Sequence, residues 1–274
     1  MSNTDQDLPQ HALERLKGLR SQGHPGGIFT SDFSVNEFLL VRKAGFEPVG
    51  LCIGSCIYHV GIQYGSWSKN QELDVLSQAM YHARELAMTR MREEAADMGA
   101  DGVVGVQLTV KRLAWDANVL EFVAIGTGVV HAEGSPAFKG PKGQPFTSDL
   151  SGQDFWTLLQ AGYRPLEMVM GSCVYHVAHR GFMKTLGQAG QNVELTNFSQ
   201  AMYDAREIAM ERMQNEATEA RAEGVVGVDL HEGNHVWEPH VIEFFAVGTA
   251  VVPISSEPSA SKIPDPQLVL SVNS

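Results

Sequence analysis

Two short runs of the sequence each carry a cysteine and a histidine at the same spacing. Cys56 and His59 stand in GSCIYHV, and Cys173 and His176 stand in GSCVYHV. Thiolate and imidazole are ligands that Zn²⁺ and copper ions prefer. Both runs are predicted to be strands, in which successive side chains point to opposite faces, so one ion could be shared only if the strand ends early or neighbouring subunits add ligands. The pattern favours the alternative, a buried thiol and a hydrogen-bonded histidine at a subunit contact.

The densest group of histidines lies in HEGNHVWEPH at 231–240. If a hairpin turns in the middle of this run, His235 and His240 face each other with Cβ atoms about 5 Å apart. With a nearby glutamate, that pair could hold Zn²⁺ or another borderline cation. The matching positions earlier in the chain are Leu113 and Asn118, so only the second half would carry such a site. The alternative interpretation is an exposed polar turn.

Two arginines and two glutamates also occur at matched positions. Arg84 and Arg206 lie in the middle of predicted long helices, on or beside the apolar face, while Glu121 and Glu243 lie on predicted strands. An arginine near a buried surface usually needs a carboxylate partner, because an unpaired buried charge is costly. We therefore expect structural ion pairs at an assembly interface, with a site for an anionic ligand as the less favoured alternative.

These residues are matched because one module is written twice. The runs that match between the two copies are separated by segments that are expected to be loops, where insertions are tolerated. The matching runs are FTSDFS at 29–34 and FTSDLS at 146–151, GSCIYHV at 54–60 and GSCVYHV at 171–177, QAMYHAREL at 78–86 and QAMYDAREI at 200–208, and GVVGV at 102–106 and 224–228.

The repeat predicts the domain organisation. Gly- and Pro-rich sequence separates the two copies, and the last residues have the composition of a disordered end. The predicted parts are an N-terminal segment at 1–28, a first module at 29–130, a linker at 131–145, a second module at 146–252 and a disordered tail at 253–274.

Each copy is predicted to fold as an α+β module of the β-α-β-β type, in which a long helix covers a small antiparallel sheet. A short helix capped by serine precedes each first strand, and the last two strands form a hairpin. The expected short helices are 34–44 and 151–161, the first strands 48–60 and 166–177, the long helices 75–98 and 197–222, and the hairpins 103–113 with 119–130 and 225–235 with 241–252.

This module leaves part of its sheet uncovered. Three strands and one helix expose one sheet face and at least one strand edge, and the GVVGV strands are apolar on both faces. A domain of this kind usually buries such surfaces against a partner. We therefore expect the chain to form homo-oligomers.

The composition narrows the class of protein further. The chain has 274 residues, is 43% hydrophobic and carries a net charge of −12 without clustered Lys and Arg, which argues against a nucleic-acid partner. No apolar stretch is long enough to span a membrane, and the polar N-terminus lacks an export signal, so a cytoplasmic location is expected. Three cysteines in such a chain are expected to be reduced.

The run from each long helix into the hairpin resembles the bacterial YbjQ family. The pattern is R-E-(L/I)-A-M-x-R-M-x-x-E-A, then G-V-V-G-V, then E-F-x-A-x-G-T-(G/A)-V-V, and it occurs in both copies. The resemblance implies β-α-β-β modules that form a pentameric ring, and the family carries a heavy-metal-binding label. Five chains of two modules would then form two stacked rings, one from each copy.

No catalytic motif stands out. The sequence lacks a nucleophile elbow, a phosphate loop and a dinucleotide fingerprint, and the glycines of GVVGV lie within a strand. The leading prediction is a non-enzymatic, cytoplasmic, pentameric scaffold that binds a protein partner, a small ligand or a metal ion. The alternative is a soft-metal-binding protein that uses Cys and His at subunit junctions.

Overall fold

A computed structural model of the chain confirms the α+β class and follows the two repeats. The described residues are 14, 29–59, 69–112, 119–134, 138–178, 196–233 and 241–254.

The first repeat has the predicted order of elements. Its short helix α2 begins after Ser34, whose hydroxyl accepts a hydrogen bond from the Glu37 amide while the Glu37 carboxylate caps the Ser34 amide in return. This reciprocal cap is why the helix starts where FTSDFS ends. The elements are α2 (Val35–Lys43), β1 (Phe46–His59), α3 (Asp74–Asp97), β3 (Gly102–Arg112) and β4 (Val119–His131).

The second repeat follows the same plan. Ser151 caps its short helix by accepting a hydrogen bond from the Asp154 amide. The long helix ends at Glu219, three residues before the predicted end. The elements are α4 (Gly152–Gln160), β6 (Tyr163–His176), α6 (Thr196–Glu219), β7 (Gly224–Gly233) and β8 (Val241–Pro253).

The glycine of each GSC motif lets the long helix touch the first strand. A Cβ atom on Gly54 would lie 2.0 Å from the Ala87 carbonyl oxygen, and one on Gly171 would lie 1.9 Å from the Ala209 carbonyl oxygen. Only glycine fits where two backbones approach this closely. The repeated glycine therefore has a packing role in both modules.

Each sheet gains a fourth strand from the other repeat, which the sequence analysis did not predict. β2 (Gln71–Glu72), just before α3, pairs antiparallel with β6, so the sheet order of the second repeat is β2-β6-β8-β7. β5 (Phe146–Ser148), at the start of the second repeat, pairs parallel with β3, so the other order is β1-β4-β3-β5. The repeats are thus joined by an exchange of strands.

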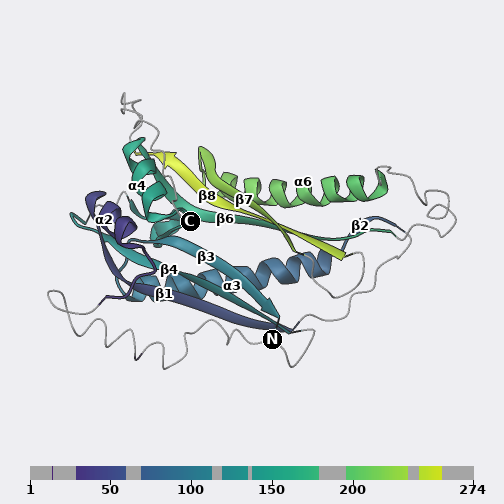
Figure 1. The fold of residues 1–274 in the computed structure, drawn as a ribbon, viewed down its shortest axis with the longest axis horizontal. Helices are drawn as coiled ribbons and strands as arrows, with labels where there is room; N and C mark the ends of the chain where they lie inside the picture. Colours follow the sequence, from purple (N-terminus) through teal and green to yellow (C-terminus); the bar gives the residue numbers. More distant parts are fainter. Residues whose placement is uncertain are drawn as a thin grey trace, which may run out of the picture.

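The molecule is a stack of four layers (Figure 1). α6 covers one side of the second sheet, α3 lies between the second sheet and its own sheet, and the first sheet closes the stack. α3 is therefore buried on two sides, whereas α6 has one covered side. The stack ends in a helix at one end and in a bare sheet face at the other.

Several described residues of the segment predicted as a linker, 131–145, contact the first repeat. β4 runs to His131, and the Phe138 ring lies edge-on to Phe46 with centroids 5.2 Å apart. The Lys139 ammonium lies 2.6 Å from an Asp101 carboxylate oxygen. These contacts join part of this segment to the first repeat.

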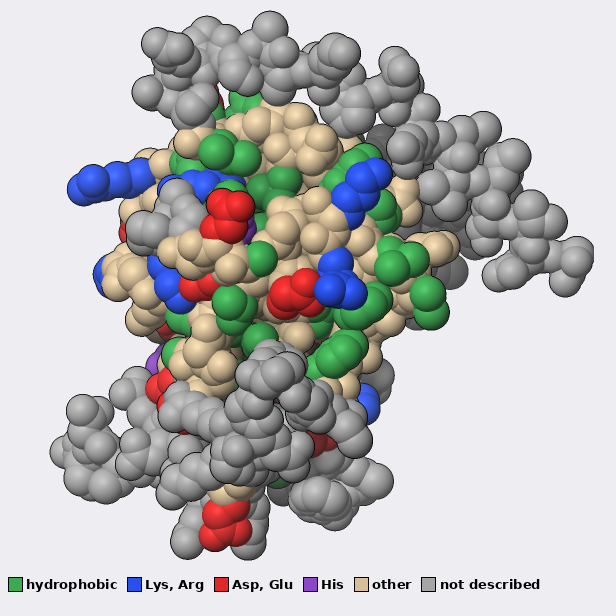
Figure 2. Space-filling view, turned by 90° about the vertical axis from the view of Figure 1, so that its left-hand side faces the viewer, with side chains coloured by type: hydrophobic (Ala, Val, Ile, Leu, Met, Phe, Trp, Pro, Cys, Tyr) green, Lys and Arg blue, Asp and Glu red, His purple; other side chains and the backbone are tan. Residues whose placement is uncertain are grey.

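The end of the molecule that carries α2 and α4 has apolar side chains at its surface, set among charged ones (Figure 2). Val35 and Leu39 of α2 are exposed there. None of the described helices is both long enough and apolar enough to cross a membrane.

Candidate functional site

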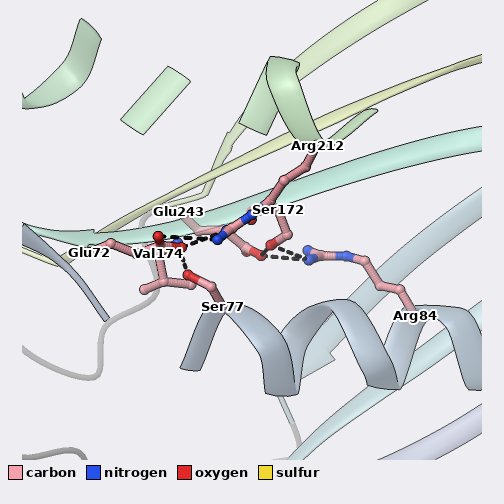
Figure 3. Close-up of polar contacts among 7 residues, drawn as sticks. All are labelled: Glu72, Ser77, Arg84, Ser172, Val174, Arg212 and Glu243. Carbon is pink, nitrogen blue, oxygen red and sulfur yellow. Dashed lines mark hydrogen bonds and ion pairs between the residues drawn. The ribbon is translucent and has the colours of Figure 1, made fainter. Parts of the chain in front are cut away.

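A buried ion pair joins the two repeats at the centre of the stack. Arg84 of α3 lies against Glu243 of β8, with the guanidinium Nη1 2.6 Å from the carboxylate Oε1, and both side chains are buried (Figure 3). Ser172 of β6 accepts from Arg84 at 3.1 Å and donates to Glu243 at 3.0 Å. The Arg84 guanidinium also lies over the Phe245 ring, 4.0 Å from its centroid. This network holds the first repeat's helix on the second repeat's sheet.

Two further polar contacts fasten the start of α3 to the second sheet. The Val174 amide donates to the Ser77 hydroxyl at 2.8 Å, and the Leu73 amide donates to the Val174 carbonyl at 2.8 Å. Beside them, Arg212 of α6 holds Glu72 of β2 with two hydrogen bonds of 2.5 and 3.1 Å (Figure 3). Such a two-pronged pair is geometrically specific, so it sets the position of the exchanged strand.

A tyrosine–carboxylate pair also joins the two repeats. The Tyr81 hydroxyl of α3 donates to Glu216 of α6, whose second oxygen accepts from the Met170 amide at 2.6 Å. Burial raises the pKa of Glu216 to about 7, opposed by these two hydrogen bonds and reinforced by the negative charge of Glu167. The same burial and the Glu216 carboxylate raise the pKa of Tyr81. The Glu216 carboxyl, with a pKa near neutrality, therefore lies at a contact between the repeats.

An aromatic cluster forms the other half of the junction. Phe46 of the first repeat packs edge-on against Phe146 of β5 and Phe155 of α4, with ring centroids 6.1 and 5.2 Å apart. Together with Val41, Val104 and Val129 these rings form one buried cluster to which both repeats contribute. Burial of this apolar area stabilises the exchange of β5.

The Cys–His pairs do not form ligand sets among the described residues. On β1, Cys56 is buried on the side facing α3, whereas His59 is exposed on the opposite side. In the second repeat Cys173 and His176 are both buried, and His176 Nδ1 lies 3.3 Å from the Lys69 carbonyl oxygen. No group of three or more His, Cys, Asp or Glu side chains in the described chain could hold a metal ion.

The electrostatics of the thiols also matter for metal binding. Burial raises the pKa of Cys173 to about 12, with a further increase from Glu72, and burial raises the pKa of Cys56 as well. The ligand form of cysteine is the thiolate, so these environments disfavour it at neutral pH. His235 and His240 lie outside the described residues.

Arg206 and Glu121, the other two residues expected to form ion pairs, are far apart within the chain. The Arg206 guanidinium lies over the Tyr203 ring on the open side of α6, 4.4 Å from its centroid. Glu121 is half-buried on the outer face of the first sheet. These two surfaces are the opposite ends of the layer stack (Figure 1).

Sequence reasoning missed several residues of the junction. Ser77 and Tyr81 both recur in the second copy, as Ser199 and Tyr203. Repetition was therefore the available signal, but nothing in the sequence indicated that these side chains contact the other repeat. The remaining members that were missed are Glu72, Ser172, Arg212 and Glu216.

Comparison with known proteins gives consistent matches in both repeats. A sequence model of the YbjQ family, described as "Putative heavy-metal-binding", matches residues 70–132 and 163–253. An encapsulin nanocompartment protein of Mycobacterium tuberculosis is 48% identical over 240 residues, covering 88% of this chain and 89% of the relative. UPF0145 proteins of Clostridium perfringens and Vibrio campbellii are 33% and 38% identical over 92 and 102 residues. These matches cover 32% and 35% of this chain, and 85% and 95% of the relatives.

Proposed function

Because the chain belongs to the YbjQ family, we propose that it is a non-enzymatic, self-assembling scaffold protein of the bacterial cytoplasm. The observation that carries the proposal is the form of the junction between the repeats. A helix surface of the first repeat binds a sheet surface of the second, so the two joined surfaces differ. The helix surface of the second repeat and the sheet surface of the first repeat are left uncovered, at the two ends of the layer stack. This arrangement lets further copies join head to tail.

The role of the assembly is proposed from the relative in Mycobacterium tuberculosis. That protein is called an encapsulin nanocompartment protein, and its similarity extends over both repeats. We carry the same role to this chain: it contributes a structural part to a protein compartment, and another protein of that compartment is its partner. A scaffold role agrees with a junction built from packing and ion pairing.

The number of copies is a separate part of the proposal. The family resemblance implies rings of five modules, and a homopentamer of this chain would hold ten modules, enough for two such rings. In the stacked-ring arrangement expected from the sequence, each ring contains one repeat only. The contact between unlike repeats instead supports rings in which the two repeats alternate.

Native mass spectrometry of the untagged full-length chain tests the scaffold. We expect a discrete multiple of the 29.9 kDa chain mass, with five as the multiple implied by the family. A species that remains a monomer at micromolar concentration would overturn the scaffold. In producing cells, the chain is expected to sediment with particles far larger than this assembly, and sedimentation as the free assembly would contradict the compartment role.

The family description favours one second candidate function, the binding of a soft or borderline metal ion such as Zn²⁺ or copper. In the arrangement expected from the sequence, Cys56, His59, Cys173 and His176 supply the ligands across subunit contacts, and three of them, Cys56, Cys173 and His176, are buried within the chain. His235 and His240 would form a separate site.

Elemental analysis of the protein purified without chelators or a His-tag tests the metal. Stoichiometric metal that is lost when Cys56 and Cys173 are changed to serine would support this function. A fully assembled, metal-free protein would contradict it.

A further inference from the structure

We infer that the open side of α6 binds the bare face of the first sheet of a second copy of this chain, repeating the junction seen inside one chain. This inference rests on the proposed self-assembly and identifies its surfaces. We call the open side of α6 with the edge of β7 the helix surface. We call the outer face of β1 and β4 with residues 29–31 the sheet surface.

The two surfaces are exposed, and each corresponds in the other repeat to a surface that is buried at the internal junction. Val174 of β6 is 0% exposed beneath α3, but its counterpart Ile57 on β1 is 62% exposed. Val106 of β3 is 4% exposed, and its counterpart Val228 on β7 is 44% exposed. The sequence keeps these positions apolar in both copies although only one copy covers them. A second chain would bury the others in the same way.

The polar groups of the two surfaces are complementary. Arg206 is the counterpart of Arg84, and it would meet Glu121 and Ser55, the counterparts of Glu243 and Ser172. The positive charge of the pair, on Arg206, lies on the helix surface, and the carboxylate, on Glu121, lies on the sheet surface. This arrangement favours contact between unlike surfaces over contact between like ones.

The helix surface is also hollowed where the sheet surface would fit. A hollow of about 450 Å³ opens beside Tyr203 and Arg206, between α6 and the β7–β8 hairpin. At the internal junction the corresponding Arg84 lies over Phe245, and Val123 holds the matching position on the sheet surface. The hollow therefore lies where side chains of the outer sheet face would enter.

The strand edges match as well. Among the described strands, β1 and β7 are edge strands, whereas the equivalent strands β6 and β3 of the other repeat are covered on that side by β2 and β5. Residues 29–31 repeat the FTS of β5, and Phe29 is 38% exposed whereas Phe146 is 0% exposed. We infer that these residues pair with β7 of the next chain as β5 pairs with β3.

A glycine preserves the space for this strand. A Cβ on Gly102 would lie 2.2 Å from the Phe146 ring, so glycine is needed where β5 is seated. Its counterpart Gly224 has no described atom within 4 Å of a built Cβ. A second chain that places Phe29 over Gly224 accounts for the empty space.

Charge exchange tests the inference in the full-length protein. Arg206→Glu and Glu121→Arg should each raise the dissociation constant of the assembly at least tenfold, because each places like charges face to face. The double variant should regain wild-type assembly, since it restores opposite charges at every junction. The measurements are sedimentation velocity and native mass spectrometry, with circular dichroism to check the fold.

The outcomes separate this inference from the proposed function. A monomeric wild-type chain would overturn the self-assembly itself. If the wild type assembles and both single variants assemble equally well, the scaffold stands and the assigned surfaces are wrong. Loss of assembly that the double variant does not restore would also overturn the pairing of Arg206 with Glu121. A single variant that unfolds is replaced by Gly224→Val, which is expected to weaken assembly by obstructing Phe29 while leaving the chain folded.

Discussion

At the residue scale, the buried ion pair of Arg84 and Glu243 joins the two repeats. Burial removes both charged groups from water, and this desolvation cost is offset by their mutual attraction and by contacts with Ser172 and the Phe245 ring. Such pairs add little stability compared with apolar residues, but the loss of one member strongly destabilises the fold because it leaves the other charge buried and unpaired. The pair therefore selects one way of placing α3 on the second sheet.

Removing the carboxylate should reveal this role. Glu243→Gln leaves the Arg84 charge buried without its counter-ion and is expected to lower the free energy of unfolding by about 3–5 kcal/mol. The matched control is Glu121→Gln, which changes the equivalent glutamate on the open sheet face and should cost less than about 1 kcal/mol in dilute solution. Denaturant titration of both variants checks the prediction, and equal losses would contradict it.

The pair of Tyr81 and Glu216 makes stability depend on pH. Burial raises the pKa of Glu216 from 4.5 to about 7, so the folded chain keeps a proton that the unfolded chain has released within this window. The free energy of unfolding should therefore fall as pH rises from about 4.5 to 7, by about 1–3 kcal/mol. Denaturant titrations across that range check the slope, and Glu216→Gln should reduce it. An unchanged slope in the variant would assign the effect to other groups.

At the element scale, the exchange of β2 and β5 explains why two small sheets make one body. Each of these short strands belongs to one repeat in sequence and to the other repeat's sheet in space. Antiparallel and parallel ladders thus cross the junction in addition to side-chain contacts. A short strand that is unstable alone becomes ordered because a sheet edge and an aromatic cluster receive it.

A pair of glycine substitutions tests the seat of β5. Gly102→Ala would place a methyl group 2.2 Å from the Phe146 ring. This overpacking is expected to lower the free energy of unfolding by about 1–3 kcal/mol. Gly224→Ala, its counterpart, meets no described atom and should leave the dilute chain as stable as the wild type. Thermal unfolding at low protein concentration compares the two variants, and a larger loss for Gly224→Ala would contradict this account.

At the scale of the whole molecule, the four-layer stack has two different ends. Contacts between unlike ends close into rings or continue as filaments, depending on the rotation between successive chains. In either case the proposed contact would make the first and second repeats alternate along the assembly. A closed ring then contains an even number of modules.

Electron microscopy of the assembly checks this alternation. A ring of a given number of chains should show twice as many lobes around its circumference, because each chain contributes two neighbouring modules. Two superposed rings with as many lobes as chains would instead support the arrangement of one repeat per ring.

The sequence by itself determined the local structure and the equivalence of the repeats. Apolar periodicity placed the long helices, the serine caps placed the short ones, and the motif alignment matched Arg84 with Arg206 and Glu121 with Glu243. These features depend on neighbours along the chain or on comparison of two written copies. They are therefore readable without a structure.

Only the tertiary structure decided which members of the matched sets meet. Arg84 contacts Glu243 of the other repeat, Cys56 and His59 point to opposite sides of β1, and β2 and β5 change sheets. The physical reason is that these contacts depend on how two modules stack, and identical local sequences are compatible with several stackings. Burial then distinguishes the copies, because one of each matched surface is covered inside the chain and the other is exposed.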